Sequence, residues 1–264
     1  MNSDVYVAFL DVLGFKDLVN NNSHEDLVRK YQNLFAANTE SSLANGAFTV
    51  VENDGKRMAI ADCTKITVNS IIISDSVVLW TPNASMKSFI DIVVATRNML
   101  VQGIFTGMPL RGGIAIGALS RLSGRLNSQT ENVVETFIGK ALVEANQIES
   151  SQQWAGCVIS PKAIAFYAEE YQRHSTTHSD LASVADLIDA GLIINYNVPM
   201  HCGLESHTVI NWPRGNKTPP SRSTVQQAFG MHKKSTDHPT VQIKINNTLQ
   251  FLDAMLPSCT QEGA

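Results

Sequence analysis

The feature that most constrains the fold is a continuous apolar run near the N-terminus, residues 5–10, which ends at Asp11. A strand of this composition has no polar face, so both of its faces must be covered by other parts of the protein. We therefore predict a buried strand in a layered α/β structure. Such a strand delivers Asp11 to its exposed C-terminal end, and Gly14 follows where the chain leaves the sheet.

Further along the chain, hydrophobic periodicity and turn residues predict the other elements. Ser23 is the expected N-cap of a helix over 24–38, and residues 40–62 read as an irregular or hairpin excursion. We predict further helices over 85–102, 139–151, from 161 and over 240–256. We predict further strands over 65–73, 77–80, 110–117, 156–159, 192–198 and 207–212.

Composition limits the classes of function. The chain has 264 residues, 44% of them hydrophobic, and a formal net charge of −4. It can fill a sizeable core, but it lacks the sequence-wide basic field expected of a protein that binds a nucleic-acid polymer. The N-terminus has no basic leader, and we find no run of about 20 uninterrupted apolar residues, so we expect a cytoplasmic protein without a membrane partner. The four cysteines have no CxxC spacing, which argues against a zinc ribbon; we expect reduced, mostly buried thiols.

Two aspartates are candidates for metal chemistry. Asp11 ends the first strand, and Asp75 lies in the polar turn between two β-rich runs. Carboxylates held by a rigid sheet are suitable ligands for Mg²⁺ or Mn²⁺. From their spacing alone, structural roles are favoured, with Asp11 capping the next helix and Asp75 satisfying its own turn; the surrounding motifs change this interpretation.

Four short motifs around these aspartates occur in a recognisable order. They are FLDVLGF at 9–15, ISDS at 73–76, LRGGIAIG at 110–117 and GKALVEA at 139–145. Over about residues 4–165 the chain resembles the class III nucleotidyl cyclases. The resemblance implies a ferredoxin-like βαββαβ fold of the α/β (α+β) class, with a mostly antiparallel sheet. We expect one domain over 1–264, with a core at about 4–165 and an added C-terminal hairpin and helix at about 190–256.

The resemblance also implies roles for individual residues. Asp11, Asp75 and the carbonyl of Val12 would hold two Mn²⁺ or Mg²⁺ ions, and the amides around Gly14 and Phe15 would contact phosphates. Lys16 would add positive charge, or would be a solvated lysine in the first turn of a helix. Arg111 would reach the triphosphate, or would pair with a surface carboxylate.

Several positions depart from the family pattern. The residue that reads a purine base is Ile71 here, and the second base-reading position is Thr136. Neither offers the lysine or the carboxylate of an adenylate cyclase, so the base pocket has changed. Val143 and Gln147 stand where the family has a transition-state Asn and Arg. We expect Arg111, Arg121, Asn146 or Gln147 to be possible substitutes.

The bacterial pyrimidine cyclases of the Pycsar antiphage systems carry the same LDVLGF and ISDS signatures, and the chain resembles them. The resemblance implies a homodimeric phosphorus-oxygen lyase that converts UTP, or alternatively CTP, into the cyclic nucleotide and pyrophosphate. The product would activate a separate effector during phage infection. A degenerate cyclase domain that binds a nucleotide or mediates dimerisation is a second interpretation. A nucleotidyl transferase of the related palm fold is a third, which the acidic net charge disfavours.

Two further features have weaker functional interpretations. His174 and His178 have helical spacing but lack partners at recognisable metal-ligand spacing, so we expect surface residues. The Pro- and Gly-rich stretch 211–224 is predicted to be a loop. Its basic residues could serve a lid above phosphates, but we favour a solvated connection; they are Arg214, Lys217 and Arg222.

Overall fold

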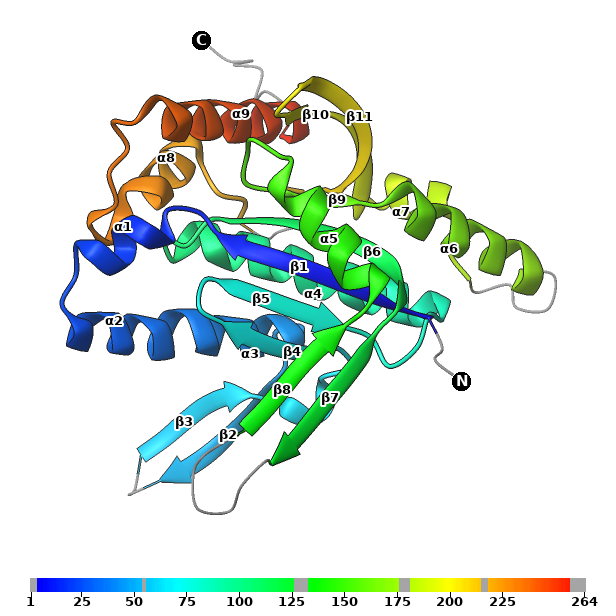
Figure 1. Ribbon diagram of the computed structural model, residues 1–264, viewed down its shortest axis with the longest axis horizontal. Helices are drawn as coiled ribbons and strands as arrows, with labels where there is room; N and C mark the ends of the chain where they lie inside the picture. The colour runs from blue at the N-terminus through cyan, green and yellow to red at the C-terminus, as the bar shows by residue number, and fades with distance from the viewer. Residues whose placement is uncertain (1–3, 54–55, 126–132, 176–180, 215–217, 257–264) are drawn as a thin grey trace, which may run out of the picture.

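The computed structural model describes residues 4–53, 56–125, 133–175, 181–214 and 218–256 (Figure 1). The strands are β1 (Asp4–Val12), β2 (Phe48–Asn53), β3 (Lys56–Ala61), β4 (Asn69–Ile73), β5 (Ser76–Trp80), β6 (Leu110–Ala118), β7 (Ser120–Arg125), β8 (Val133–Ile138), β9 (Cys157–Ile159), β10 (Ile193–Met200) and β11 (Gly203–Ile210). The helices are α1 (Phe15–Asn20), α2 (His24–Lys30), α3 (Ala37–Leu43), α4 (Met86–Phe105), α5 (Lys140–Ser150), α6 (Pro161–His174), α7 (Val184–Asp189), α8 (Arg222–Gly230) and α9 (Pro239–Met255).

The described strands form one seven-stranded sheet and two separate hairpins. The order in the large sheet is β10-β11-β9-β6-β1-β5-β4. Among the described strands of this sheet, β6 and β9 pair in parallel and the other neighbours are antiparallel. Strands β1, β4, β5 and β6 and the helices between them run in βαββαβ order. The predicted mixed fold with a mostly antiparallel sheet is confirmed.

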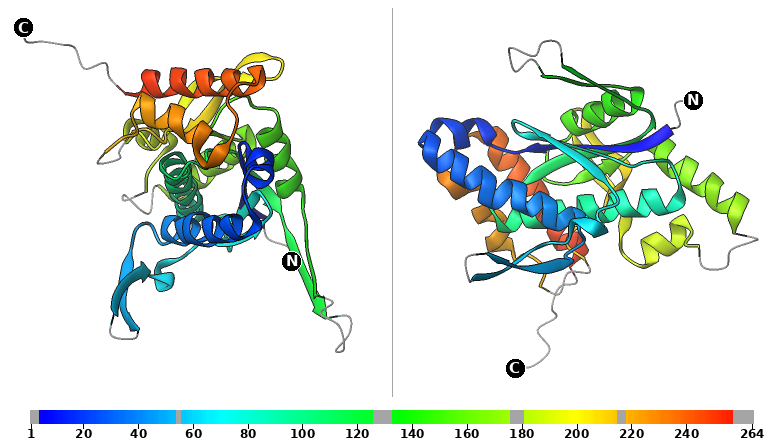
Figure 2. Two further views of the ribbon diagram at one scale, coloured as in Figure 1. Left: turned by 90° about the vertical axis from the view of Figure 1, so that its left-hand side faces the viewer. Right: turned by 90° about the horizontal axis from the view of Figure 1, so that it is seen from below.

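The central strand β1 has apolar residues on both faces, as the continuous apolar run predicts. Tyr6 and Leu10 point into the larger core, which includes residues of α4, whereas Val5 and Val7 pack with alanines of α5. Helices α4 and α5 therefore cover opposite faces of the sheet (Figure 2). Because side chains alternate along a strand, Asp11 lies on the α5 face.

The helix predicted from Ser23 is longer and less regular than expected. Ser23 is its N-cap and its side chain accepts from the amide of Asp26. The helical path then continues from α2 through a π-helical segment, Tyr31–Ala36, into α3. Single-turn π segments inside α-helices occur frequently at functional sites, and Tyr31 contacts the turn that carries Asp75.

Helix α4 is the long core helix behind β1. By length and composition alone it could cross a membrane, but 61% of its most apolar window is buried inside the protein. Ser85, where the predicted helix begins, is its N-cap. The burial identifies α4 as a core element of this fold.

Two hairpins extend away from the large sheet (Figures 1 and 2). Strands β2 and β3 form one, where the sequence indicated an irregular or hairpin excursion. Strands β7 and β8 form the other, which the sequence analysis did not predict. Large apolar side chains are exposed on both; they are Phe48, Val50, Met58, Ile60, Leu122 and Ile138.

The C-terminal part forms the predicted hairpin and helix, with an additional helix between them. Strands β10 and β11 pair, and α9 buries Phe251 against Trp154 and Tyr196, with ring centroids 4.6 and 4.9 Å away. The loop predicted over 211–224 was wrong at its C-terminal end, because α8 begins at Arg222 with Ser221 as its N-cap. A serine in a polar stretch can cap a helix as well as extend a loop.

The expectation that the cysteines are mostly buried was also wrong. Cys157 is buried, but Cys63 and Cys202 are exposed. All three are free thiols, as predicted. Cys259 lies outside the described residues.

Candidate functional site

The two candidate aspartates lie at the same end of the sheet. Asp11 pairs with Ser76 of β5 on one side and with Arg111 of β6 on the other. Asp75 immediately precedes Ser76 in the two-residue turn between β4 and β5, and its carbonyl oxygen accepts from the amide of Val12 at 3.0 Å. The tertiary structure thus brings together two carboxylates from separate parts of the chain.

The electrostatic environment of Asp11 is unfavourable to its negative charge. Burial raises the pKa of Asp11 to about 6, and the negative charges of Glu149 and Asp75 add to this effect. The positive charges of Arg111 and Lys244 oppose it. A carboxylate in such surroundings gains stability when a cation binds to it.

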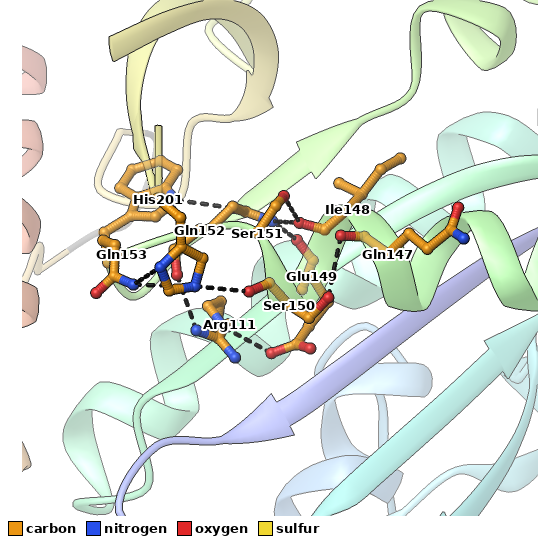
Figure 3. Close-up of polar contacts among 11 residues, drawn as sticks. Arg111, Gln147, Ile148, Glu149, Ser150, Ser151, Gln152, Gln153 and His201 are labelled. Atoms are coloured by element: carbon orange, nitrogen blue, oxygen red, sulfur yellow. Dashed lines mark hydrogen bonds and ion pairs between the residues drawn. The ribbon is translucent and has the colours of Figure 1, made fainter. Parts of the chain in front are cut away.

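Arg111 is held in a buried polar network at the end of α5 (Figure 3). Its Nε donates to Glu149 Oε1 at 2.5 Å, and its Nη1 donates to the carbonyl oxygen of Gln152 at 2.8 Å. The side chains of Arg111 and Glu149 are only 13% and 5% exposed. Arg111 therefore pairs with a carboxylate, but with a buried one rather than a surface one. The two bonds use two of the five donors of a guanidinium group.

Glu149 and Lys244 belong to this charged cluster, although the sequence analysis did not select either. Burial raises the pKa of Glu149 in spite of its pairing with Arg111. Burial also lowers the pKa of Lys244 on α9, and the positive charge of Arg111 adds to this effect, while Asp11 and Glu149 oppose it. Neither residue lies in a recognisable motif, so only the approach of α5 and α9 to the end of β1 could reveal them.

The loop after β1 has a left-handed turn at Gly14, with φ of 82°, where α1 begins. Phe15 packs against the main core, and Lys16 is exposed in the first turn of α1. Lys16 thus has the position that its second interpretation describes, whereas its contact with phosphate stays a prediction. A buried lysine, Lys234, lies under this loop and was not selected from the sequence.

The turn that carries Asp75 is supported by the π-helical segment. The hydroxyl of Tyr31 donates to the carbonyl oxygen of Ser74. Burial raises the pKa of Tyr31, and the negative charge of Asp75 adds to this effect. Ser74 has a positive φ of 56°, which a polar residue in a tight turn tolerates. The aromatic side chain thus helps to position the turn.

The proposed base-reading positions lie in different places. Ile71 of β4 pairs with Val78 of β5 and packs on the α5 face, the face on which Asp11 lies. Thr136 lies on the β7–β8 hairpin, opposite Leu122, in a sheet separate from that of the aspartates. The fold places Ile71 on the same sheet face as Asp11 but does not place Thr136 in that sheet.

Val143 and Gln147 are both exposed on the outer side of α5. Residues of the same helix that face the sheet are buried; they are Ala141, Ala145 and Glu149. Val143 and Gln147 line a large open pocket of about 930 Å³ together with Ile138 and Gly139. The same pocket is lined by Asp4 of β1 and Gly117 of β6, at the end of β1 opposite to Asp11. Val143 and Gln147 can therefore act only on a molecule that enters this pocket.

The weaker sequence features do not assemble into a second site. His174 lies 3.4 Å from Glu170 on the same helix, and His178 is outside the described residues. Arg222 forms an ion pair with Asp253, and Lys217 is outside the described residues. Within the described ranges, no group of three or more His, Cys, Asp or Glu side chains is placed to hold a metal ion.

Comparison with known proteins gives likeness at the level of structure. No protein-family model matches the chain, and no curated protein sequence matches it. The guanylyl cyclase domain of the RhoGC fusion protein from the aquatic fungus Blastocladiella emersonii is 14% identical, with a TM-score of 0.46, and the alignment covers 79% of this chain and 96% of that one.

Two other solved structures give comparable values. The guanylate cyclase domain of RhGC from Catenaria anguillulae, in complex with GTP, is 14% identical with a TM-score of 0.43, over 80% of this chain and 97% of that one. A bacterial light-regulated adenylyl cyclase is 13% identical with a TM-score of 0.49, over 90% of this chain and 57% of that one.

Proposed function

We propose that the protein is a nucleotidyl cyclase of the class III type that converts UTP into 3′,5′-cyclic UMP and pyrophosphate. The observation that carries the proposal is the meeting of Asp11 and Asp75 at one end of the sheet. The amide of Val12 bonds the carbonyl of Asp75 at 3.0 Å, and the charge of Asp75 contributes to the raised pKa of Asp11. Two negatively charged carboxylates that repel each other are stabilised when cations bind between them.

The donor set fits hard divalent cations. Asp11 and Asp75 supply carboxylate oxygens and Val12 supplies a carbonyl oxygen, which suits Mn²⁺ or Mg²⁺ with water and phosphate as the remaining ligands. When bound, two such ions would lower the pKa of the ribose 3′-hydroxyl and neutralise the leaving pyrophosphate. The 3′-oxygen attacks the α-phosphorus in line, and the bond from that phosphorus to the bridging oxygen of pyrophosphate breaks.

The other residues bind and orient the substrate. The amides around Gly14 and Phe15 would contact the β- and γ-phosphates, with Lys16 adding charge at the surface of α1. Arg111 would direct its remaining donors to the triphosphate while Glu149 holds its Nε. Lys244 adds a second half-buried positive charge near Asp11. These groups would act as fixed charges around the transferring phosphorus.

Selection of a pyrimidine base is supported by the chemistry of two positions. Ile71 cannot donate a hydrogen bond to a purine ring nitrogen, and Thr136 offers a hydroxyl group instead of a carboxylate. CTP is therefore the alternative substrate, since neither residue distinguishes uracil from cytosine.

A homodimer would complete the site. Thr136 lies on the separate hairpin, and Val143 and Gln147 line a pocket beside Asp4, at the end of β1 opposite to Asp11. If these residues act on a nucleotide, it is therefore one held by Asp11 of another copy. A second copy would place its Asp11 and Asp75 against this pocket. The exposed apolar side chains of the β7–β8 hairpin support such a contact.

We further propose that the cyclic nucleotide is a second messenger in bacterial antiphage defence, made in the cytoplasm and read by a separate effector. The motif resemblance to the Pycsar pyrimidine cyclases supports this role. Deletion of the gene from a host that carries the effector should remove protection against phage, and Asp75→Asn should have the same result.

The direct test is incubation of the purified protein with each of the four ribonucleoside triphosphates and Mn²⁺, with products identified by mass spectrometry. Cyclic UMP that disappears in Asp75→Asn supports the proposal, and cyclic CMP in place of cyclic UMP would favour the CTP alternative. A product that persists in Asp75→Asn would contradict the metal assignment.

A second candidate function is a degenerate cyclase-like module that binds a nucleotide or mediates dimerisation. It is favoured by the exposed Val143 and Gln147, which lack the chemistry of the family's Asn and Arg, and by the pairing of Arg111 with Glu149. Four intact triphosphates after incubation, together with measurable nucleotide binding, would support this function.

A further inference from the structure

A lysine from the C-terminal part of the chain lies beneath the loop that follows β1. Lys234 is only 6% exposed, and its Nζ donates to the carbonyl oxygens of Gly107 at 2.8 Å and Leu13 at 3.4 Å. Burial lowers the pKa of Lys234 to about 7, and the negative charge of Asp17 opposes this effect. A buried ammonium group that binds two backbone carbonyls joins two turns that are distant in sequence.

The segment that delivers this lysine, residues 231–235, has an unusual backbone. His232 and Lys233 have φ of 61° and 63°, in the left-handed region that residues with a Cβ atom rarely adopt. Two side-chain amides just beyond the C-terminal end of α1 hold the segment in place. Asn22 donates to the carbonyl oxygen of His232, and Asn21 donates to that of Lys233, at 2.8 Å each.

Two glycines with positive φ make room for the same segment. A Cβ atom at Gly14 would lie 2.9 Å from Lys234 Cδ, and one at Gly107 would lie 2.5 Å from Met231 Cβ. The amide of Leu13 also donates to the carbonyl oxygen of Pro109 at 2.9 Å. The glycine of the LDVLGF motif therefore allows close approach of Lys234 as well as the left-handed turn.

We propose that Lys234 is a positioning residue that holds the loop at 12–15 in the conformation required for the triphosphate, an inference that rests on the proposed function. Its amino group bridges this loop to the 107–109 turn, and in its protonated form, which the negative charge of Asp17 favours, it places positive charge on the inner side of the loop. The outer side, with the amides of Gly14 and Phe15, would face the phosphates. Attraction between a buried cation and an anion is strong because the local dielectric constant is low.

The experiment compares Lys234→Met with Lys233→Met, a neighbouring lysine that is exposed. Binding of inorganic triphosphate with Mn²⁺ is measured by calorimetry, amide exchange at residues 13–15 by mass spectrometry, and KM and kcat with UTP. In Lys234→Met we expect Kd and KM to rise about tenfold, the effect of losing a charged hydrogen-bonding group, with kcat within about threefold. Exchange at 13–15 should become faster, and Lys233→Met should match the wild type.

Lys234→Arg guards against a purely structural effect and against a variant that does not fold. Lys234→Arg keeps the charge and the donors, so it should recover part of the triphosphate affinity that the neutral variant has lost. Lys234→Gln replaces Lys234→Met as the neutral variant if Lys234→Met is unstable. Wild-type values of Kd and amide exchange in the neutral variant would overturn the proposal, as would a loss confined to kcat. If the wild type binds triphosphate without turnover, only the cyclase is rejected. If it binds none, both proposals are rejected.

Discussion

Two regions of the molecule place side chains in unfavourable surroundings: one buries charged groups, and the other exposes apolar groups to water. At the end of β1, charged groups are withdrawn from water; Glu149 is 5% exposed and Arg111 is 13% exposed. On the β2–β3 and β7–β8 hairpins, apolar groups face water; Phe48 is 59% exposed and Ile138 is 60% exposed. Both arrangements cost free energy in the isolated chain.

The difference between the two regions indicates different partners. Burial raises the pKa of Asp11, and the negative charges of Glu149 and Asp75 add to this effect, so the first region would be stabilised by cations and the phosphates they bind. A two-stranded hairpin is marginal in water by itself, so the second region would be stabilised by a protein surface. Each prediction below tests one side of this comparison.

The largest effect is expected from Asp75→Asn. The variant keeps the turn and its backbone bond to Val12 but removes one carboxylate, so turnover of UTP should fall about 1,000-fold, the equivalent of several kcal/mol of transition-state stabilisation. Product formation with Mn²⁺ measures the effect, and a melting temperature near that of the wild type serves as control. Unchanged turnover would show that the charged region at the end of β1 is not needed for catalysis.

The next effect concerns the buried pair of Arg111 and Glu149. Glu149→Met leaves the Arg111 charge without its carboxylate, so we expect it to lower the free energy of unfolding by about 3 kcal/mol. The double variant Arg111→Met with Glu149→Met should cost less than the sum of the two single variants, as measured by urea unfolding. Additive costs would show that the pair is not coupled.

A smaller effect is expected from the hairpins. Phe48→Ser on β2 and Ile138→Thr on β8 remove exposed apolar area, so monomer stability should change by about 0.5 kcal/mol or less. Self-association, measured by sedimentation, should weaken about tenfold or more if these side chains become buried between copies. The control is Leu204→Thr, which is 72% exposed on β11 of the large sheet and should leave association unchanged.

The smallest effect is a pH-dependent difference in the free energy of unfolding between Asp11→Asn and the wild type, both without metal. The pKa of Asp11 in the folded protein, about 6, lies above the ordinary value of about 3.9, so the folded state retains a proton that the unfolded state loses between these values. The contribution of Asp11 to stability therefore falls as pH rises through that window. Because Asp11 is partly exposed and solvent screens its charge, Asp11→Asn should gain only about 1 kcal/mol over the wild type above pH 6, and nothing near pH 4. An equal gain at both pH values would contradict the assignment.

The sequence predicted much of the fold because its signals are local. The apolar run before Asp11 indicated a buried strand, and the Ser74–Asp75 turn between two β-rich runs indicated the hairpin. Ser23 was the predicted N-cap of a helix, which the structure confirms, and the helix predicted from residue 85 begins at Met86. The β7–β8 hairpin was missed because its strands are paired to each other alone and lack the hydrophobic alternation of a core strand.

By itself, the sequence determined the two aspartates, the apolar strand that carries the first of them, and the glycine after it, because each depends on neighbours a few residues away. Only the tertiary structure placed Glu149, Lys234 and Lys244 beside them. These residues belong to helices and turns far along the chain, and their burial and charge interactions exist only after the sheet has brought α5, the 231–235 segment and α9 to one end of β1. Local patterns indicate which groups can do chemistry, whereas long-range packing decides which charges they meet.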